Sequence, residues 1–166
     1  GKPLIAWSIE AGLKSEYIDE VMVTSDNDEI IEIAKNFEAN VPFKRPYELA
    51  GDYATRSDVI THTVKFYEKE LKKKFDYIVF LQPTSPLRNA KHIDEAIEYM
   101  FSKKGDATVS VCEVEHPIHW SGPLPKDNNM SQFLDKVSVQ SRSQDLPTSY
   151  RLNGAIYICD VNTLTC

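Results

Sequence analysis

The stretch Tyr77-Ile-Val-Phe-Leu81, followed directly by Gln82-Pro-Thr-Ser-Pro-Leu-Arg88, decides the fold class of this 166-residue chain. Five consecutive apolar residues are typical of a strand that is buried on both faces, as in parallel sheets. Because Pro83 and Pro86 cannot continue a β-ladder, we expect the strand to end at Leu81 or Gln82. A polar loop then follows the carboxyl end of a buried strand, which is where open α/β sheets bind their ligands. The sequence therefore predicts an α/β fold with a ligand site at this loop.

Helical patterns alternate with short extended segments over most of the chain. The pattern Thr55-x-x-Asp58 is a capping box, Asp26-x-x-Glu29 indicates a second helix start, and Asn89 is expected to cap the helix after the loop. Helices are predicted at residues 4–14, 26–37, 55–71 and 89–101, and strands at residues 20–24, 77–81, 107–114 and 155–159. This alternation of strand and helix favours α/β layers.

The composition is that of one soluble globular domain. Hydrophobic residues make up 42% of the chain and charged residues 27%, which is ordinary for a chain that buries its own core. No apolar run approaches the roughly 20 residues that cross a bilayer, and no signal peptide opens the chain, so no membrane partner is expected. A net charge of −6 argues against a nucleic-acid partner but allows a small anionic substrate. Of three cysteines, Cys112 and Cys159 lie in apolar runs, which indicates reduced thiols and a cytoplasmic location.

Three motifs together resemble the CMP-sialic acid synthetases, or acylneuraminate cytidylyltransferases. They are Arg45-Pro46-x-x-Leu49-Ala50-x-Asp52, the string Leu81–Arg88, and Tyr150-Arg-Leu-Asn-Gly-Ala-Ile-Tyr157. The motifs occur in the family's order and at similar separations, and the resemblance covers roughly residues 1–160.

The resemblance implies a Rossmann-like nucleotidyltransferase, a three-layer α/β sandwich with a mostly parallel mixed sheet. It implies an enzyme that transfers CMP from CTP to a nine-carbon 2-keto sugar acid, an N-acylneuraminate, and releases pyrophosphate. A cytidylyltransferase for legionaminic acid, and a catalytically inactive binding or scaffold fragment of this fold, remain as alternatives. The branch that acts on 3-deoxy-manno-octulosonate is less expected, because its motif after the strand differs.

Candidate nucleotide-binding residues lie at the end of a short extended segment, residues 41–45, and at the start of the helix predicted at residues 55–71. Arg45 precedes Pro46, so its backbone is held extended and its guanidinium is pre-positioned. In the family this arginine lies at the nucleotide site. The family also places Ser or Thr near Thr55 and Ser57, although capping of the helix is the expected role of Thr55.

Candidate sugar-binding residues come from the loop and from the third motif. By resemblance, Gln82 contacts the sugar acid with Thr84 and Ser85 close by, whereas Arg88 is expected to anchor the loop. Arg151 corresponds to the family's sugar-binding arginine, and a bidentate Arg–carboxylate pair suits a 2-keto acid. His119 lies in a segment that lines the family's sugar pocket, so a supporting role is expected for it. Asn153-Gly154 is a turn signal.

The helical and strand patterns stop between residues 115 and 152. Prolines and polar residues dominate this segment, which is long for a plain loop and is expected to be functional. In the family the matching region is a β-rich excursion that lines the sugar pocket and crosses to a second subunit. We therefore expect a homodimer that is joined through residues 123–146.

Both ends of the chain shape the expectation for a metal. The family carries a basic nucleotide loop before the first helix and an acidic metal-binding motif after the last strand, and the sequence contains neither. We therefore expect a single domain, residues 1–166, that is incomplete at both ends, and a Mg²⁺ cofactor whose ligands lie elsewhere. A zinc site at His116 and His119 is not expected, because Pro117 spoils a shared geometry. No residue is assigned as general base.

Overall fold

The structure, a computed structural model, describes residues 1–133 and 142–163. The chain divides into two compact units, the first formed by residues 1–110 and 154–166 and the second by residues 111–153. The excursion predicted at residues 115–152 falls within the second unit. Its role at a dimer interface stays a prediction, and residues 134–141 of it lie outside the described residues.

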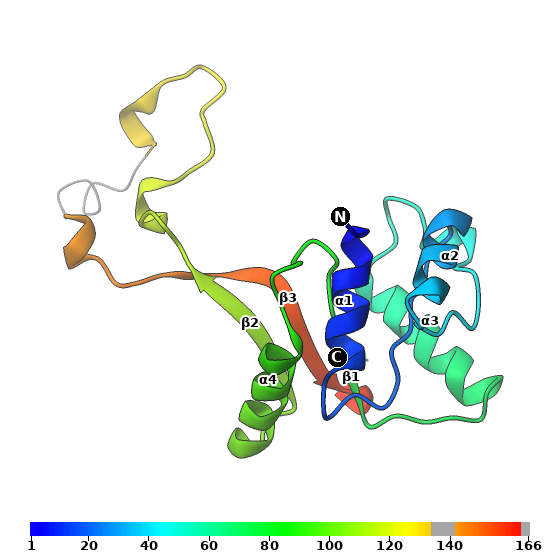
Figure 1. The fold of residues 1–166 in the computed structure, drawn as a ribbon. Coiled ribbons are helices and arrows are strands. Elements are labelled where there is room, and N and C mark those ends of the chain that lie inside the picture. The colour runs from blue at the N-terminus through cyan, green and yellow to red at the C-terminus, as the bar shows by residue number, and fades with distance from the viewer. Residues whose placement is uncertain (134–141, 164–166) are drawn as a thin grey trace. The chain divides into compact units, whose positions relative to one another are not determined.

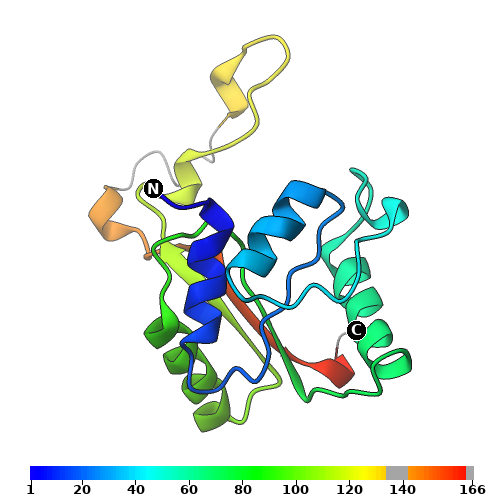
Figure 2. The same cartoon turned by 45° about the vertical axis from the view of Figure 1, so that its right-hand side comes forward.

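The first unit packs helices against a small sheet (Figure 1). Its helices are α1 (Leu4–Leu13), α2 (Asp28–Asn36), α3 (Arg56–Lys69) and α4 (Ala90–Lys103). The strands of the chain are β1 (Tyr77–Phe80), β2 (Ala107–Glu113) and β3 (Tyr150–Asp160), in the order β1-β3-β2, and the end of β2 and the beginning of β3 belong to the second unit. Figures 1 and 2 both show α1 between α4 and α2, and α1 contacts each of these helices. All four predicted helices are confirmed.

The main core forms where α4 meets β3. Ile93, Ile97 and Met100 recur at helical spacing on α4, and Ile156 and Ile158 alternate on β3, so that both elements bury one apolar face. A second cluster joins α1 and α2 through Ile9, Ala34 and Ala39. These two clusters fix α1 between its neighbouring helices.

The sheet is less regular than the sequence predicts. β1 pairs with β3 in antiparallel fashion, with Phe80 opposite Tyr157, so the mostly parallel sheet is not confirmed. β1 is not buried on both faces, since Tyr77 is 38% exposed and the other three residues are half-buried.

The strand predicted at residues 20–24 does not form a β-ladder, so this prediction is wrong. It forms a single parallel bridge between Met22 and Asn40, with Val23 N donating to Asn40 O at 2.9 Å. The next donor in a parallel ladder would be the backbone N–H of residue 42, and Pro42 has none, so the pairing stops.

Two boundaries also differ from the prediction. Asn27, rather than Asp26, caps α2, and its side-chain oxygen accepts from Glu29 N and Ile30 N at 2.8 and 3.1 Å. The prediction of a turn at Asn153-Gly154 is wrong, because β3 runs continuously through both residues, with Gly154 at a φ of 76°. Only glycine adopts this backbone conformation inside a strand without strain.

No helix in residues 1–133 or 142–163 is both long enough and apolar enough to span a membrane.

Candidate functional site

The polar loop after β1 is built from two successive turns. Ser85 N donates to Gln82 O at 3.3 Å, and Arg88 N donates to Ser85 O at 3.2 Å. Asn89 then caps α4, because its side-chain oxygen accepts from His92 N at 3.1 Å. The loop is therefore held between a strand and a capped helix, as the sequence predicts. Within it Thr84 is exposed, and Ser85 and Gln82 are half-buried.

Arg88 anchors this loop, as predicted. Its side chain is buried, and Nη2 donates to Ser8 Oγ on α1 at 2.6 Å. Burial lowers the pKa of the Arg88 guanidinium from its ordinary value, because the charged form is desolvated. The cation nevertheless remains protonated at neutral pH.

Gln82 and Gly154 bring two of the three motifs into contact. A Cβ atom at Gly154 would overlap the side-chain oxygen of Gln82 and would lie 3.1 Å from its Cδ. The amide of Gln82 therefore lies against the backbone of β3, in space that only a glycine leaves open. This contact places the residue that is predicted to bind the sugar acid.

Arg45 is held in place by Thr24 and Ser25. Its Nε donates to Thr24 Oγ1 at 3.3 Å, its Nη2 donates to Thr24 O, and its backbone N donates to Ser25 O at 2.9 Å. Within the described part of the chain Nη1 makes no hydrogen bond, so this group is available to a ligand. The guanidinium is therefore pre-positioned, as the sequence predicts.

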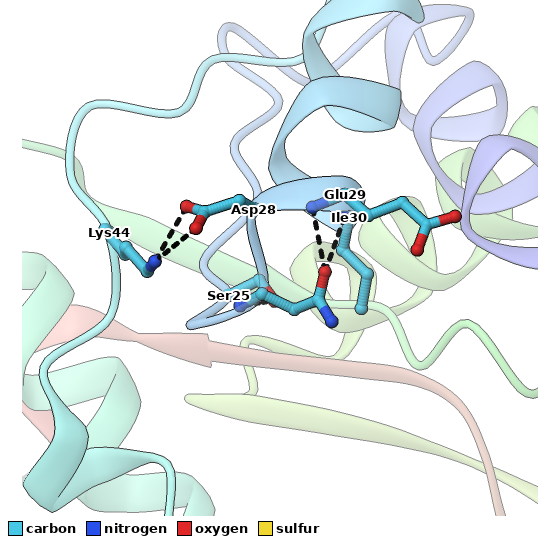
Figure 3. Close-up of polar contacts among 6 residues, drawn as sticks. Ser25, Asp28, Glu29, Ile30 and Lys44 are labelled. Atoms are coloured by element: carbon cyan, nitrogen blue, oxygen red, sulfur yellow. Dashed lines mark hydrogen bonds and ion pairs between the residues drawn. The ribbon is translucent and has the colours of Figure 1, made fainter.

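Polar contacts at the start of α2 hold Lys44, the residue before Arg45 in the chain (Figure 3). Lys44 Nζ donates to the Asp28 carboxylate at 2.7 Å, and Ser25 Oγ accepts from the backbone N of Asn27 at 3.2 Å. These contacts tie the start of α2 to the segment that carries Arg45.

The two hydroxyl residues at the start of α3 differ in their contacts. Thr55 Oγ1 accepts from Asp58 N at 3.2 Å, and the Asp58 carboxylate accepts from both the hydroxyl and the backbone N of Thr55. The hydrogen bond from the Thr55 hydroxyl, and to a lesser extent that from its backbone N, lower the pKa of Asp58. The hydroxyl of Thr55 is thus used in capping, whereas Ser57 is exposed and makes no hydrogen bond within the described residues. A nucleotide role for either residue stays a prediction.

Sequence reasoning missed Arg56, the first residue of α3. Its guanidinium carbon lies 4.4 Å from the ring centroid of Tyr157 and 5.2 Å from that of Phe80. The register of β1 and β3 sets these rings opposite one another, two residues before Gln82 and three after Gly154. The sequence around Arg56 does not indicate these ring contacts, because only the pairing of β1 with β3 brings Phe80 and Tyr157 together beside it.

Arg151 and His119 belong to the second unit. Arg151 lies in the first part of β3 and is exposed, and His119 lies in a short 3-10 helix, Ile118–Trp120. The side chain of His119 lies outside what the structure describes. Because the other sugar-binding candidates belong to the first unit, a shared sugar site stays a prediction.

The Mg²⁺ that the resemblance implies stays a prediction. Residues 1–133 and 142–163 contain no cluster of three or more His, Cys, Asp or Glu side chains that could hold a metal ion. No step below therefore depends on a metal ligand from this part of the chain.

A cavity of about 660 Å³ lies between α1, α3, residues 17–24 and β1. Its wall is mainly apolar and includes Val21, Val23, Val64, Val79 and Leu81. Such a wall does not suit a triphosphate or a sugar acid. Arg45 and Ser8 line the cavity, whereas Gln82, Thr84 and Ser85 do not. The sugar-binding candidates of the loop after β1 therefore lie outside this cavity.

Comparison with known proteins gives consistent matches over nearly the whole chain. The model of a family described as "Cytidylyltransferase" matches residues 1–157. A pseudaminic acid cytidylyltransferase of Campylobacter jejuni is 35% identical over 157 residues, which are 95% of this chain and 67% of that protein. An N-acylneuraminate cytidylyltransferase of Escherichia coli is 35% identical over 160 residues, 96% of this chain and 36% of that protein. A CMP-N,N'-diacetyllegionaminic acid synthase of Legionella pneumophila is 34% identical over 163 residues, 95% of this chain and 67% of that protein.

Among solved structures, a CMP:2-keto-3-deoxy-manno-octonic acid synthetase complexed with CTP shares the fold. The TM-score is 0.67 at 14% sequence identity, over 99% of this chain and 66% of that one. At this identity the match bears on the fold alone, and it agrees with an α/β architecture.

Proposed function

Because the chain belongs to the cytidylyltransferase family, we propose that it transfers CMP from CTP to a nine-carbon 2-keto sugar acid, an N-acylneuraminate, and releases pyrophosphate. The observation that carries this proposal is the contact between Gln82 and Gly154, which joins two of the family's motifs at the end of β1. A site that is assembled from both motifs suits recognition of a polar substrate at a strand end.

In the proposed reaction the anomeric hydroxyl of the sugar acid attacks the α-phosphorus of CTP. A new bond forms between the sugar oxygen and phosphorus, the bond to the pyrophosphate oxygen breaks, and the hydroxyl proton passes to a base that we do not assign. Catalysis of this kind is mostly positioning and neutralisation of charge, so arginines and hydroxyls are the side chains that we expect to line the site. Mg²⁺ would supply further neutralisation of the triphosphate.

The residues divide into two proposed subsites. Arg45, with Ser57 and Thr55 at the start of α3, serves the nucleotide. Gln82, with Thr84 and Ser85, contacts the sugar, and Arg151 pairs with its carboxylate through two parallel hydrogen bonds. We place His119 beside the sugar in a supporting role.

The choice of sugar acid needs an experiment, because relatives named for three different acids are 34–35% identical to this chain. The test is pyrophosphate release by the full-length protein with CTP and, separately, N-acetylneuraminic, legionaminic and pseudaminic acids. We expect turnover with N-acetylneuraminic acid to exceed that with the other two. Faster turnover with either of the others would reassign the substrate, and no turnover with any acid would support an inactive scaffold. Replacing CTP with ATP should abolish turnover, and equal activity with ATP would refute a cytidylyltransferase.

We also propose that the protein is a homodimer joined through the second unit. Its apolar side chains Ile118, Leu124 and Met130 are 53%, 66% and 52% exposed. Apolar side chains gathered on one small unit are typical of a surface that another subunit covers.

A further inference from the structure

One buried serine links α1 to the loop that carries Gln82. Ser8 is 6% exposed, and its Oγ accepts hydrogen bonds from Arg88 Nη2 at 2.6 Å and Nη1 at 3.4 Å. The same hydroxyl donates to the backbone oxygen of Gln82 at 3.5 Å. That oxygen also accepts from Ser85 N at 3.3 Å, so the carbonyl of Gln82 is held from two sides.

The side-chain hydrogen bonds of Arg88 depend on this serine. Arg88 is 6% exposed, and Ser8 is the one side-chain hydrogen-bond partner of its guanidinium within residues 1–133 and 142–163. Its Nε is buried and has no partner in that part of the chain. Buried arginines are normally paired with a carboxylate, because an uncompensated charge is costly to desolvate. This arrangement is therefore a poor source of stability, and its geometry rests on one hydroxyl.

Gln82 is fixed at both of its ends. Ser8 and Ser85 hold its backbone carbonyl, while its side-chain amide lies against Gly154. A shift of the carbonyl that displaces the Cα atom of Gln82 would also move the amide, because the carbonyl carbon and the side chain are both attached to that atom. The position of the amide is thus coupled to Ser8.

We propose that Ser8 is a positioning residue for the sugar-acid subsite, acting through Arg88 and the carbonyl of Gln82. This rests on the proposed function of Gln82. None of the three motifs contains Ser8, and a single serine inside a helical pattern gives no signal in the sequence.

The test compares Ser8→Ala with Ser15→Ala in the full-length protein. Ser15, just after α1, donates to the Asp94 carboxylate of α4, so Ser15→Ala also removes a bond between the α1 region and its surroundings. We expect Ser8→Ala to raise the KM for the sugar acid at least about fivefold and to leave the KM for CTP within about twofold, as loss of one positioning hydrogen bond implies. Ser15→Ala should lower Tm and leave both KM values unchanged.

A double-mutant cycle sharpens this test. Arg88→Lys keeps the charge but loses the paired donors, so it should raise the KM for the sugar acid as Ser8→Ala does. Because the two residues act as one unit, the double variant should be no worse than the more impaired single variant. Independent effects that multiply would overturn the proposed coupling.

A ligand-free measurement separates this proposal from the proposed function. The side-chain amide of Gln82 gives a resonance pair in ¹⁵N-correlated spectra, which Gln82→Glu identifies by its loss. We expect this pair to shift in Ser8→Ala and to stay in place in Ser15→Ala, whether or not a sugar acid is turned over. An unmoved pair, or a Ser8→Ala variant that loses Tm with no change in the sugar KM, would show a merely structural serine. A shifted pair in a protein that turns over no sugar acid would support the coupling and refute the proposed function.

Discussion

Replacing Gly154 with alanine would place a methyl group where the side-chain oxygen of Gln82 lies. The clash involves the far end of a flexible side chain, so the Gln82 amide can move away without disturbing the core. The φ of 76° cannot relax so easily, because an L-residue in this conformation is strained by about 1–2 kcal/mol. For a domain of this size that strain corresponds to a fall in Tm of roughly 2–8 °C.

The functional effect follows from the displaced amide. If Gln82 gives up one hydrogen bond to the sugar acid, about 0.5–1.5 kcal/mol is lost, and the KM for the sugar should rise roughly two- to twelvefold. The KM for CTP should stay near its original value, since Arg45 lies in a different segment and is held by Thr24. Steady-state kinetics of pyrophosphate release and thermal melts of the same protein samples give both quantities.

Gly105→Ala is the matched control. A Cβ atom at Gly105 would have no neighbour nearer than 3.5 Å, the Ala107 carbonyl oxygen, which is ordinary van der Waals contact. In this variant both KM values should stay unchanged, and Tm should fall by less than in Gly154→Ala. A Gly154→Ala enzyme with an unchanged sugar KM would refute the idea that Gly154 positions Gln82. An unchanged Tm would refute the strain at position 154.

Three further predictions concern other parts of the chain. Arg151→Lys should raise the sugar KM or lower turnover by roughly tenfold or more, because lysine cannot form two parallel bonds to a carboxylate, and an effect on CTP instead would reverse the subsites. Burial raises the pKa of Glu20, but hydrogen bonds from Lys73 and Tyr67 outweigh this effect and hold the pKa below its ordinary value. Glu20 therefore stabilises the fold fully above its unfolded-state pKa of about 4.3, and this stabilisation is lost as pH falls through the lowered pKa of the folded state. Tyr67→Phe should therefore raise the pKa of Glu20 in an NMR titration and weaken stability most at neutral pH, and an unmoved pKa would contradict this. Light scattering at micromolar concentration should give the mass of a dimer, and a monomer would argue against assembly through the second unit.

Local chemistry explains which elements were predictable. Thr55-x-x-Asp58 forms both bonds of its capping box, and Asn89 caps α4, because capping depends only on residues three positions apart. The strand at residues 20–24 depended on a partner segment, and Pro42 in that partner stops the ladder. Asn153-Gly154 signals a positive φ correctly but does not say whether it lies in a turn or in a strand.

The site shows the same division between local and long-range information. Motif resemblance predicted Gln82 and Arg45 as site residues, which stays a prediction, and the anchoring role of Arg88, which is confirmed, because each lies in a contiguous string. Ser8 and Arg56 were missed, since their contacts join segments more than 20 residues apart and arise only when helices pack on the sheet. Such contacts leave no spacing pattern in a single sequence.

The way in which the loop after β1 is secured also indicates which of its positions is open to variation, given the proposed role of this loop in sugar binding. The two turn bonds and the Arg88 anchor use backbone groups and Ser8, and the side chain of Thr84 takes no part in them. Thr84 is exposed, and its hydroxyl makes no hydrogen bond within the described residues. Libraries that vary position 84 while keeping Gly154 and Ser8 would therefore explore new acceptor sugars on an unchanged scaffold.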